Sequence, residues 1–237
     1  MKKKLSIPNV TLIATTSVDI NETQLSLRVS AHNINFGKIK LLSSSQPKEK
    51  YPDIEYVKIP DIDFDGYNKF IIQDLHKYFN TSHCLIVQAD SFVVNSNLWK
   101  EDFLKYDYIG APWPDIMRVK NTSQNKELVL DLKKNPVGNG GFSLRSHKLT
   151  KVTSKINYDS LKFPLKSEDI IICNYLYEKM IEQGIHFAPA EIAAKFSMEN
   201  VDHLYGQDVN SVFGFHGKHL RSYFLKRYAL RAPLGEW

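Results

Sequence analysis

Short apolar runs alternate with helix-like patterns along the first third of the chain, and this alternation limits the possible folds more than any other feature. The run Val10–Val18 predicts a strand, Glu22–Ile34 predicts a helix, and Gly37–Ser44 predicts a second strand. The same order then recurs as a strand, a helix and a strand, at Ile54–Pro60, Tyr67–Phe79 and His83–Asp90. Such alternation predicts an α/β fold with a largely parallel central sheet covered by helices.

The second half of the chain is less regular. Asp115–Asn135 is polar apart from a short strand-like run, which predicts a loop or hairpin beside the sheet. Val137–Ser146 predicts a strand entered through glycines, and Ser167–Gly184 predicts a helix that begins at an N-cap serine and ends at glycine. Ile185–Asn200 predicts a further strand and a short helix. No linker or repeat interrupts the chain, so we expect one domain over residues 1–237.

The composition is that of a globular protein. The 237 residues are 43% hydrophobic and 24% charged, which is enough to form a large buried core. No apolar run approaches the roughly 20 residues of a membrane-spanning helix, and the N-terminal pattern is not that of a signal peptide. We therefore expect a cytoplasmic protein. Cys84 and Cys173 lie in apolar patterns without metal-ligand spacing and are predicted to be buried free thiols.

The net charge of +5 is concentrated at the two ends. The lysines at positions 2 to 4 and the segment 217–237 together carry a net +7, which leaves a net −2 for the rest of the chain and argues against nucleic-acid binding. The C-terminal segment places Leu220, Tyr223, Phe224 and Tyr228 at helical spacing among basic residues. This pattern fits a peripheral helix at the inner face of the plasma membrane, and equally a helix packed on its own domain.

Asp90 ends the buried-strand pattern of CLIVQAD. Ligands of open parallel sheets bind at the carboxyl ends of strands, where loops can present polar groups without breaking the core. A carboxylate there fits an oxygen ligand for Mg²⁺ or Mn²⁺ that bridges a substrate diphosphate. An ordinary turn residue is the alternative.

The stretch VGNGG contains Gly138, Gly140 and Gly141, which permit left-handed backbone angles and the close approach of a bulky ligand. It matches neither the Walker nor the Rossmann phosphate-binding pattern, because the glycines precede a strand. A tight turn or bulge is the alternative.

Two further signals involve titratable side chains. Glu168 and Asp169 follow Ser167 in the first turn of a predicted helix, where they either stabilise the helix terminus or supply a general base for an acceptor hydroxyl. His216, within FGFHG, is either a packed histidine or the ligand that completes a metal site begun by Asp90.

Taken together and in this order, several segments resemble a glycosyltransferase-like family of mostly unassigned specificity with the nucleotide-sugar transferase fold called GT-A. The matching pieces span residues 67–217: YNKF, LIVQADSFV, YDYIGAPW, VGNGGFSLRS, SED, AEIAAKFSMEN and FGFHG. The resemblance implies a GT-A-like single domain with a mostly parallel sheet. YDYIGAPW and VGNGGFSLR are its most specific parts.

The resemblance implies a role for each matching residue. Asp90 resembles the surviving acid of a DxD-type motif for metal and donor diphosphate, with Gln88 in place of the first acid. Asp169, beside Glu168, resembles the catalytic base of inverting enzymes, and Trp113 is expected to stack on an acceptor sugar. The remaining expected donor contacts are Thr15 and Thr16 at the nucleotide base, Lys69 and Arg145 at the diphosphate, and Asn139, Gly140 and Gly141 at the sugars.

The implied function is transfer of a sugar from a nucleotide-diphosphate donor, expected to be a UDP-sugar, to a glycan or lipid-linked acceptor in cell-surface polysaccharide synthesis, such as that of lipopolysaccharide. The reaction is expected to invert the anomeric centre and to use Mn²⁺ or Mg²⁺ held by Asp90 and His216. Two alternatives stay open. One is a non-catalytic sugar-binding or scaffold protein on a degenerate transferase fold, which Gln88 favours. The other is a sugar nucleotidyltransferase, although ATTSVDINET lacks the glycines of such a phosphate loop.

Overall fold

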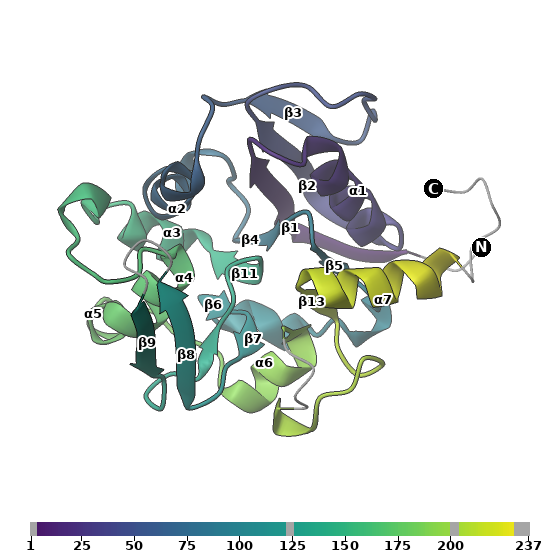
Figure 1. Ribbon diagram of the computed structural model, residues 1–237. Helices are drawn as coiled ribbons and strands as arrows, with labels where there is room; N and C mark the ends of the chain where they lie inside the picture. The colour runs from purple at the N-terminus through teal and green to yellow at the C-terminus, as the bar shows by residue number, and fades with distance from the viewer. Residues whose placement is uncertain (1–3, 122–125, 200–203, 230–237) are drawn as a thin grey trace.

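The computed structural model describes residues 4–121, 126–199 and 204–229, and these form a mixed α/β unit (Figure 1). Within them, six strands form the central sheet in the order β3-β2-β1-β4-β11-β6. Strands β3, β2, β1 and β4 run parallel, and β11 is antiparallel to both of its neighbours. The predicted α/β fold with a mostly parallel sheet is confirmed. The strand bounds are β1 Leu5–Thr16, β2 Ile34–Ser43, β3 Glu55–Lys58, β4 His83–Val87, β6 Tyr108–Ile109 and β11 Phe142–Ser146.

Helices cover both faces of this sheet because its strands bury side chains on each side. In β1, Leu12 packs in one cluster with Leu27 of α1 (Ile20–Ala31). The next residue, Ile13, packs in the other cluster with Phe70 of α2 (Phe64–Gln73). Successive side chains of a strand point to opposite faces, so β1 contributes to both halves of the core.

A second, smaller sheet lies against the carboxyl end of β4. It has the order β12-β13-β5, from Ser197–Met198, Gly214–His216 and Ser91–Val93. Strand β5 follows β4 after a three-residue loop, and β13 pairs with it in an antiparallel register that sets His216 opposite Ser91. The smaller sheet therefore brings a segment near residue 216 beside the loop that contains Asp90.

Helix α7 (Lys218–Ala229) follows β13 and packs on the body of the protein. Its buried residues Leu220 and Phe224 share an apolar cluster with Phe92 and Phe215. The apolar stripe of the predicted C-terminal helix is therefore covered by its own domain, as the second of the two readings expected. Tyr223 is exposed. Residues 230–237 and the Tyr228 side chain lie outside the described part.

Among the described residues, none of the helices combines the length and the apolar character needed to cross a bilayer.

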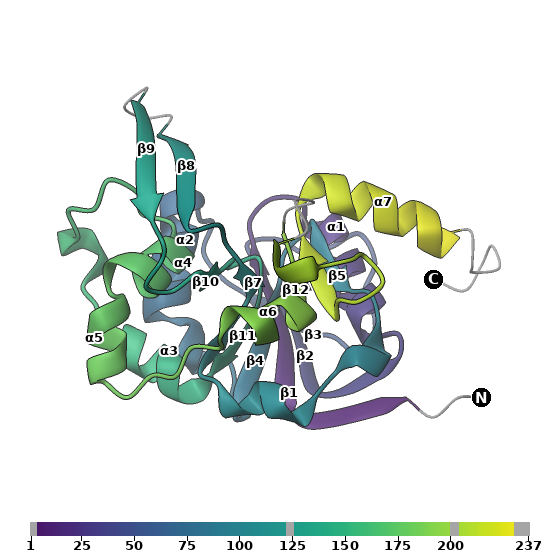
Figure 2. The ribbon, with the colours of Figure 1, turned by 90° about the horizontal axis from the view of Figure 1, so that it is seen from below.

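The remaining elements are a hairpin, a pair of short strands and several short helices and turns. The predicted hairpin is confirmed as β8 and β9, which project from the body (Figure 2). Strands β7 and β10 pair with each other. The bounds are β7 Ala111–Pro112, β8 Ile116–Asn121, β9 Lys126–Asp131, β10 Val137–Gly138, α3 His147–Thr153, α4 Glu168–Ile170, α5 Tyr177–Glu182 and α6 Ala190–Phe196. Short 3-10 turns occupy Leu75–Lys77, Ser96–Leu98, Glu101–Lys105, Tyr158–Ser160 and Leu204–Gly206.

Three local predictions were wrong. Ile34 starts β2 and does not end the preceding helix. The predicted helix 167–184 contains a π-helical turn at Ile171–Tyr175 between α4 and α5. Ser167 does occupy the predicted N-cap position but makes no side-chain cap hydrogen bond, and the Glu168 backbone N–H donates to Asn68 Oδ1 at 2.8 Å. The predicted strand after Gly184 is reduced to a single bridge at Phe187.

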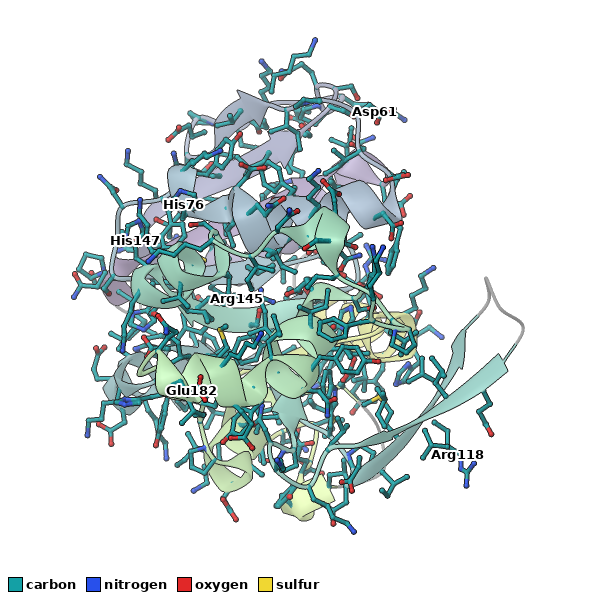
Figure 3. The ribbon with its side chains drawn as sticks, turned by 90° about the vertical axis from the view of Figure 1, so that its left-hand side faces the viewer. Asp61, His76, Arg118, Arg145, His147 and Glu182 are labelled. Carbon is teal, nitrogen blue, oxygen red and sulfur yellow. The ribbon has the colours of Figure 1, made fainter. Side chains whose placement is uncertain are left out.

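A buried ion pair joins β11 to α4. Both terminal nitrogens of Arg145 donate to the Glu168 carboxylate, at 2.6 and 2.8 Å, and the side chains are only 1% and 3% exposed. The Arg145 guanidinium also lies 5.0 Å from the ring centre of Tyr108 in β6. Figure 3 shows Arg145 in the interior, whereas Arg118 lies on the projecting hairpin. This pair connects three elements that are far apart in the sequence.

We predict that Glu168→Gln lowers the free energy of unfolding by about 3 kcal/mol, because it leaves the Arg145 charge buried without its partner. Urea unfolding at neutral pH measures the change. Glu178→Gln is the matched control, since it removes the exposed pair with Lys134 and is expected to leave stability unchanged. Replacing both buried partners by apolar residues, Arg145→Met with Glu168→Leu, should recover much of the loss. An equal effect at positions 168 and 178 would contradict the structural role of the buried pair.

Candidate functional site

A cleft of about 800 Å³ opens at the carboxyl ends of β1 and β4. Thr15 and Thr16 enter it from the end of β1, and Gln88 and Asp90 from the end of β4. All four are predicted site residues. They lie close together because β1 and β4 pair in parallel and end at the same edge of the sheet. Ala89 lines it from the loop after β4, and the other lining residues come from the starts of α1, α2 and α7 or the turns just before them: Ser17, Val18, Asp19, Glu22, Thr23, Ile62, Asp63, Phe64, Tyr67, Lys218, Arg221 and Ser222.

The loop that carries Asp90 is held by hydrogen bonds on several sides. Ser91 Oγ accepts from the Gln88 backbone N–H at 2.8 Å and donates to the Gly141 carbonyl at 2.7 Å. The Gly217 N–H donates to the Asp90 carbonyl at 3.0 Å. The loop that contains Asp90 is therefore hydrogen bonded to both the glycine-rich stretch and the start of α7. These long-range hydrogen bonds fix the position of Asp90 in addition to the local turn.

His216 lies between two carboxylates. Its Nε2 is 3.3 Å from Asp90 Oδ1, and its Nδ1 is 3.4 Å from Glu199 Oε1. Burial alone lowers the pKa of His216, but the contacts with Asp90 and Glu199 outweigh it and raise that pKa to about 10. The imidazole is therefore a cation at neutral pH. Burial raises the pKa of Asp90, but the hydrogen bond to His216 outweighs this and lowers it.

The predicted divalent-metal site does not fit this arrangement. Asp90 and His216 do meet, but the nearby carboxylate of Glu199 faces the other ring nitrogen of His216, so the three side chains do not converge on one point. In the described part of the chain, no group of three or more His, Cys, Asp or Glu side chains is arranged to hold a metal ion. A divalent cation would find one carboxylate and one imidazole in the predicted pair, which is far short of the roughly six or more ligands, mostly oxygens, that Mg²⁺ or a similar hard cation takes.

Gln88, which takes the place of the first acid of the DxD-type motif, has a partner in the cleft wall. Its Nε2 donates to the Tyr67 hydroxyl oxygen at 2.8 Å. Burial raises the pKa of Tyr67, so the phenol keeps its proton and can donate to another acceptor. Tyr67 belongs to the YNKF segment of α2, and its role was not predicted.

The first turn of α7 supplies the cations of the cleft. Lys218, Arg221 and Ser222 line it, and α7 begins immediately after Gly217, whose φ is 125°. A helix N-terminus also presents backbone N–H groups and the positive end of the helix dipole. The sequence pattern left these basic residues either at a membrane surface or on the solvated face of a packed helix, and it did not predict that they line the cleft. Their placement could have been predicted from the sequence, because Lys218 and Arg221 follow Gly217 and are three residues apart. This spacing puts both side chains on one side of the first turn of a helix.

An apolar region marks the end of the cleft near β1. Val18 and Phe64 are 70% and 68% exposed, the highest values among the large apolar side chains of the described residues, and both line the cleft. Thr15 is buried and Thr16 Oγ1 accepts from the Val18 N–H at 3.1 Å, so a local turn holds Val18 outward. Exposed apolar groups beside polar strand ends can contact a flat, partly apolar ligand such as a nucleobase.

Asp169, the other predicted base candidate, is held by two backbone N–H groups and is not among the residues that line the cleft. Its Oδ2 accepts from the Gly140 N–H at 2.9 Å, and its Oδ1 accepts from the Ile170 N–H at 2.8 Å. Burial, with the negative charge of Glu168 as the next cause, raises the pKa of Asp169 to about 6. The carboxylate is thus ionised at neutral pH yet basic enough to take a proton.

Asn139 adopts a left-handed conformation with φ of 71° and is fully buried. Neither Oδ1 nor Nδ2 of its side chain has a hydrogen-bond partner in the described structure. Gly141, two residues on, lies so close to His216 that a Cβ atom there would be 2.3 Å from Nε2. The stretch Asn139–Gly141 therefore runs between Asp169 and the Asp90–His216 contact.

Four predicted site residues have other partners. Lys69 pairs with Asp159 at 2.5 Å and does not line the cleft. Arg145 and Glu168 are buried against each other, so they are placed to hold the fold and not to contact a diphosphate or act as a base. Trp113 is buried, with its ring against Gly138, so it does not present a face to an acceptor sugar.

Glu199 contacts both Trp113 and His216, and its role was not predicted from the sequence. Its Oε2 accepts from Trp113 Nε1 at 2.6 Å, while Oε1 faces His216. Its charge also contributes to the raised pKa of Asp169. Only the folded chain brings Glu199 near these residues, because they come from four separate segments.

Comparison with solved structures gives distant similarities. Glycosyltransferase GlyE of Streptococcus pneumoniae TIGR4 is 12% identical with a TM-score of 0.47, over 91% of this chain and 59% of that chain. Mannosyltransferase PcManGT of Pyrobaculum calidifontis, in complex with GDP-Man and Mn²⁺, is 10% identical with a TM-score of 0.43, over 78% and 55%. Bifunctional IspDF of Campylobacter jejuni is 16% identical with a TM-score of 0.42, over 70% and 47%.

This chain thus spans between 47% and 59% of the length of those proteins. No curated protein matches it. A family model, DUF5672, described as a protein of unknown function, matches residues 53–216 and so includes Asp90, Asp169 and His216. The chain belongs to the DUF5672 family of proteins of unknown function.

Proposed function

We propose that the protein is a glycosyltransferase that moves a sugar from a nucleotide-diphosphate donor to an acceptor hydroxyl. The observation that carries the proposal is the composition of the cleft. It combines exposed apolar side chains at the end of β1 with two cations in the first turn of α7. A nucleoside diphosphate has the matching chemistry, since a base and an anionic diphosphate lie a short distance apart.

The donor's leaving group is stabilised by the α7 end of the cleft. As the bond between the anomeric carbon and the diphosphate oxygen breaks, negative charge grows on that oxygen. Lys218, Arg221 and the N–H groups of the helix terminus are placed to neutralise it. His216 balances the charge of Asp90 and Glu199, so these carboxylates repel the diphosphate less than two unpaired carboxylates would.

The acceptor is activated by Asp169. The hydroxyl proton passes to the carboxylate while the hydroxyl oxygen attacks the anomeric carbon, so the product is the glycoside, the nucleoside diphosphate and a proton on Asp169. Direct attack of this kind inverts the anomeric centre. Asn139, with both amide atoms unpartnered and Asp169 nearby, is suited to bind hydroxyls of the transferred sugar.

The finer parts of the assignment are also proposals. We propose a UDP-sugar as donor and a glycan or lipid-linked acceptor of cell-surface polysaccharide synthesis, with the whole chain 1–237 as one transferase domain in the cytoplasm. Mn²⁺ or Mg²⁺, where one takes part, would use Asp90 together with oxygens of the diphosphate. No step above depends on it, because the residues that the structure describes do not form a metal site by themselves.

A panel of nucleotide sugars tests the activity. Wild type and Asp90→Ala are compared for donor hydrolysis and transfer, once with Mn²⁺ and once with EDTA. The proposal expects turnover of at least one donor by the wild type. Binding of nucleotide sugars without any turnover would favour the non-catalytic alternative, and release of pyrophosphate from a sugar phosphate and a nucleoside triphosphate would favour a nucleotidyltransferase.

We predict that Asp169→Asn lowers the transfer rate by about 10²- to 10⁴-fold, the usual contribution of a general base, and leaves donor affinity unchanged. Because the pKa of Asp169 is about 6, the wild-type rate should rise with pH up to about that value and level off above it. Asp159→Asn is the control, since that carboxylate pairs with Lys69 outside the cleft. Retained transfer in Asp169→Asn would remove this residue from its role.

A further inference from the structure

We infer that Glu22 is a built-in competitor for the donor diphosphate, which it opposes by holding Arg221 across the cleft. The inference rests on the proposed function and deepens it, because it names a residue that sets the affinity of the donor site. Glu22 lies in the first turn of α1 and Arg221 in the first turn of α7, and the two side chains form an ion pair. Both residues line the cleft.

Arg221 has the donors to exchange one anion for another. Its Nη2 donates to Glu22 Oε2. Its Nε is buried and has no hydrogen-bond partner among the described residues. A guanidinium presents its donors in a planar fork that fits the oxygens of a carboxylate or a phosphate equally well. Arg221 is therefore only partly satisfied by Glu22, and a diphosphate offers it more acceptor oxygens.

Among the cleft-lining carboxylates of the described residues, Glu22 alone forms an ion pair with a side chain of α7, although the charge of Lys218 also acts on Asp90. Asp63 accepts the Gly66 N–H at the start of α2, and Asp90 contacts His216. Asp19 makes no side-chain cap hydrogen bond at the start of α1. Glu22 and Asp19 carry the same charge and line the same cleft, but only Glu22 forms the ion pair with Arg221.

The consequence is a donor site that binds diphosphate less tightly than its cations alone would allow. A ligand that takes the Nη2 donor of Arg221 must displace Glu22, whereas a ligand that does not reach Arg221 does not compete for this pair. An ion pair that is half exposed on one side is worth a small factor, roughly two- to fivefold in affinity. The same competition speeds release of the nucleoside diphosphate product, since Glu22 can take back Arg221.

A double-mutant cycle on the full chain tests this. Calorimetry measures the affinity of UDP, GDP, CDP and ADP for wild type, Glu22→Gln, Arg221→Gln and the double variant. We expect Glu22→Gln to raise the affinity of the bound nucleoside diphosphate by two- to fivefold, Arg221→Gln to lower it, and the gain from Glu22→Gln to vanish in the Arg221→Gln background. The corresponding nucleoside, which has no phosphate, should show no gain.

Asp19→Asn is the matched control, because it removes the same charge from the same cleft without touching the pair. Its effect should be the same with and without Arg221. If Glu22→Gln gives no gain, or an equal gain in the Arg221→Gln background, Glu22 acts as a general charge and the inference is wrong while the donor site stands. If none of the four nucleoside diphosphates binds the wild type, the proposed function fails and the inference fails with it.

Discussion

The buried ion pair between Arg145 and Glu168 is the interaction on which the arrangement of the site depends. Two charges removed from water must satisfy each other, and a bidentate pair does so only in one geometry. The pair ties β11 to α4, and Asn68 of α2 binds the backbone at the same point. It also requires a glycine at position 140, where a Cβ atom would lie 1.8 Å from the Glu168 carboxylate. The result is that Asp169, the next residue, faces the Gly140 backbone in a defined position.

The two acidic neighbours, Glu168 and Asp169, consequently have different tasks. Glu168 is neutralised by Arg145 and stabilises the fold, and its charge in turn helps to raise the pKa of Asp169. On the opposite side of the glycine-rich stretch, His216 plays a comparable part between Asp90 and Glu199. Each side of the site thus combines a structural cation with a carboxylate, while the cations that face the cleft come from α7.

Much of the fold could be predicted from the sequence, because strand and helix periodicities are local. The residues at the ends of β1 and β4 were also predictable, since parallel strands end on the same side of a sheet. The partners of Arg145, Lys69 and Trp113 were not, because a motif says which residues occur and not which neighbours they meet. Glu199 and the first turn of α7 were missed for the same reason. Their contacts join segments far apart in the sequence, since Trp113 and Glu199 are separated by 86 positions and Glu22 and Arg221 by 199.

The central claim is that a nucleoside diphosphate binds between the end of β1 and the start of α7. A crystal structure of the complex with a non-hydrolysable uridine diphosphate sugar tests it most directly. The account predicts the base beside Thr15 and Thr16, and the diphosphate at Lys218 and Arg221, with the sugar directed toward Asn139 and Asp169. A complex in which the nucleotide binds outside this cleft, or lies in it with its diphosphate away from α7, would contradict the account.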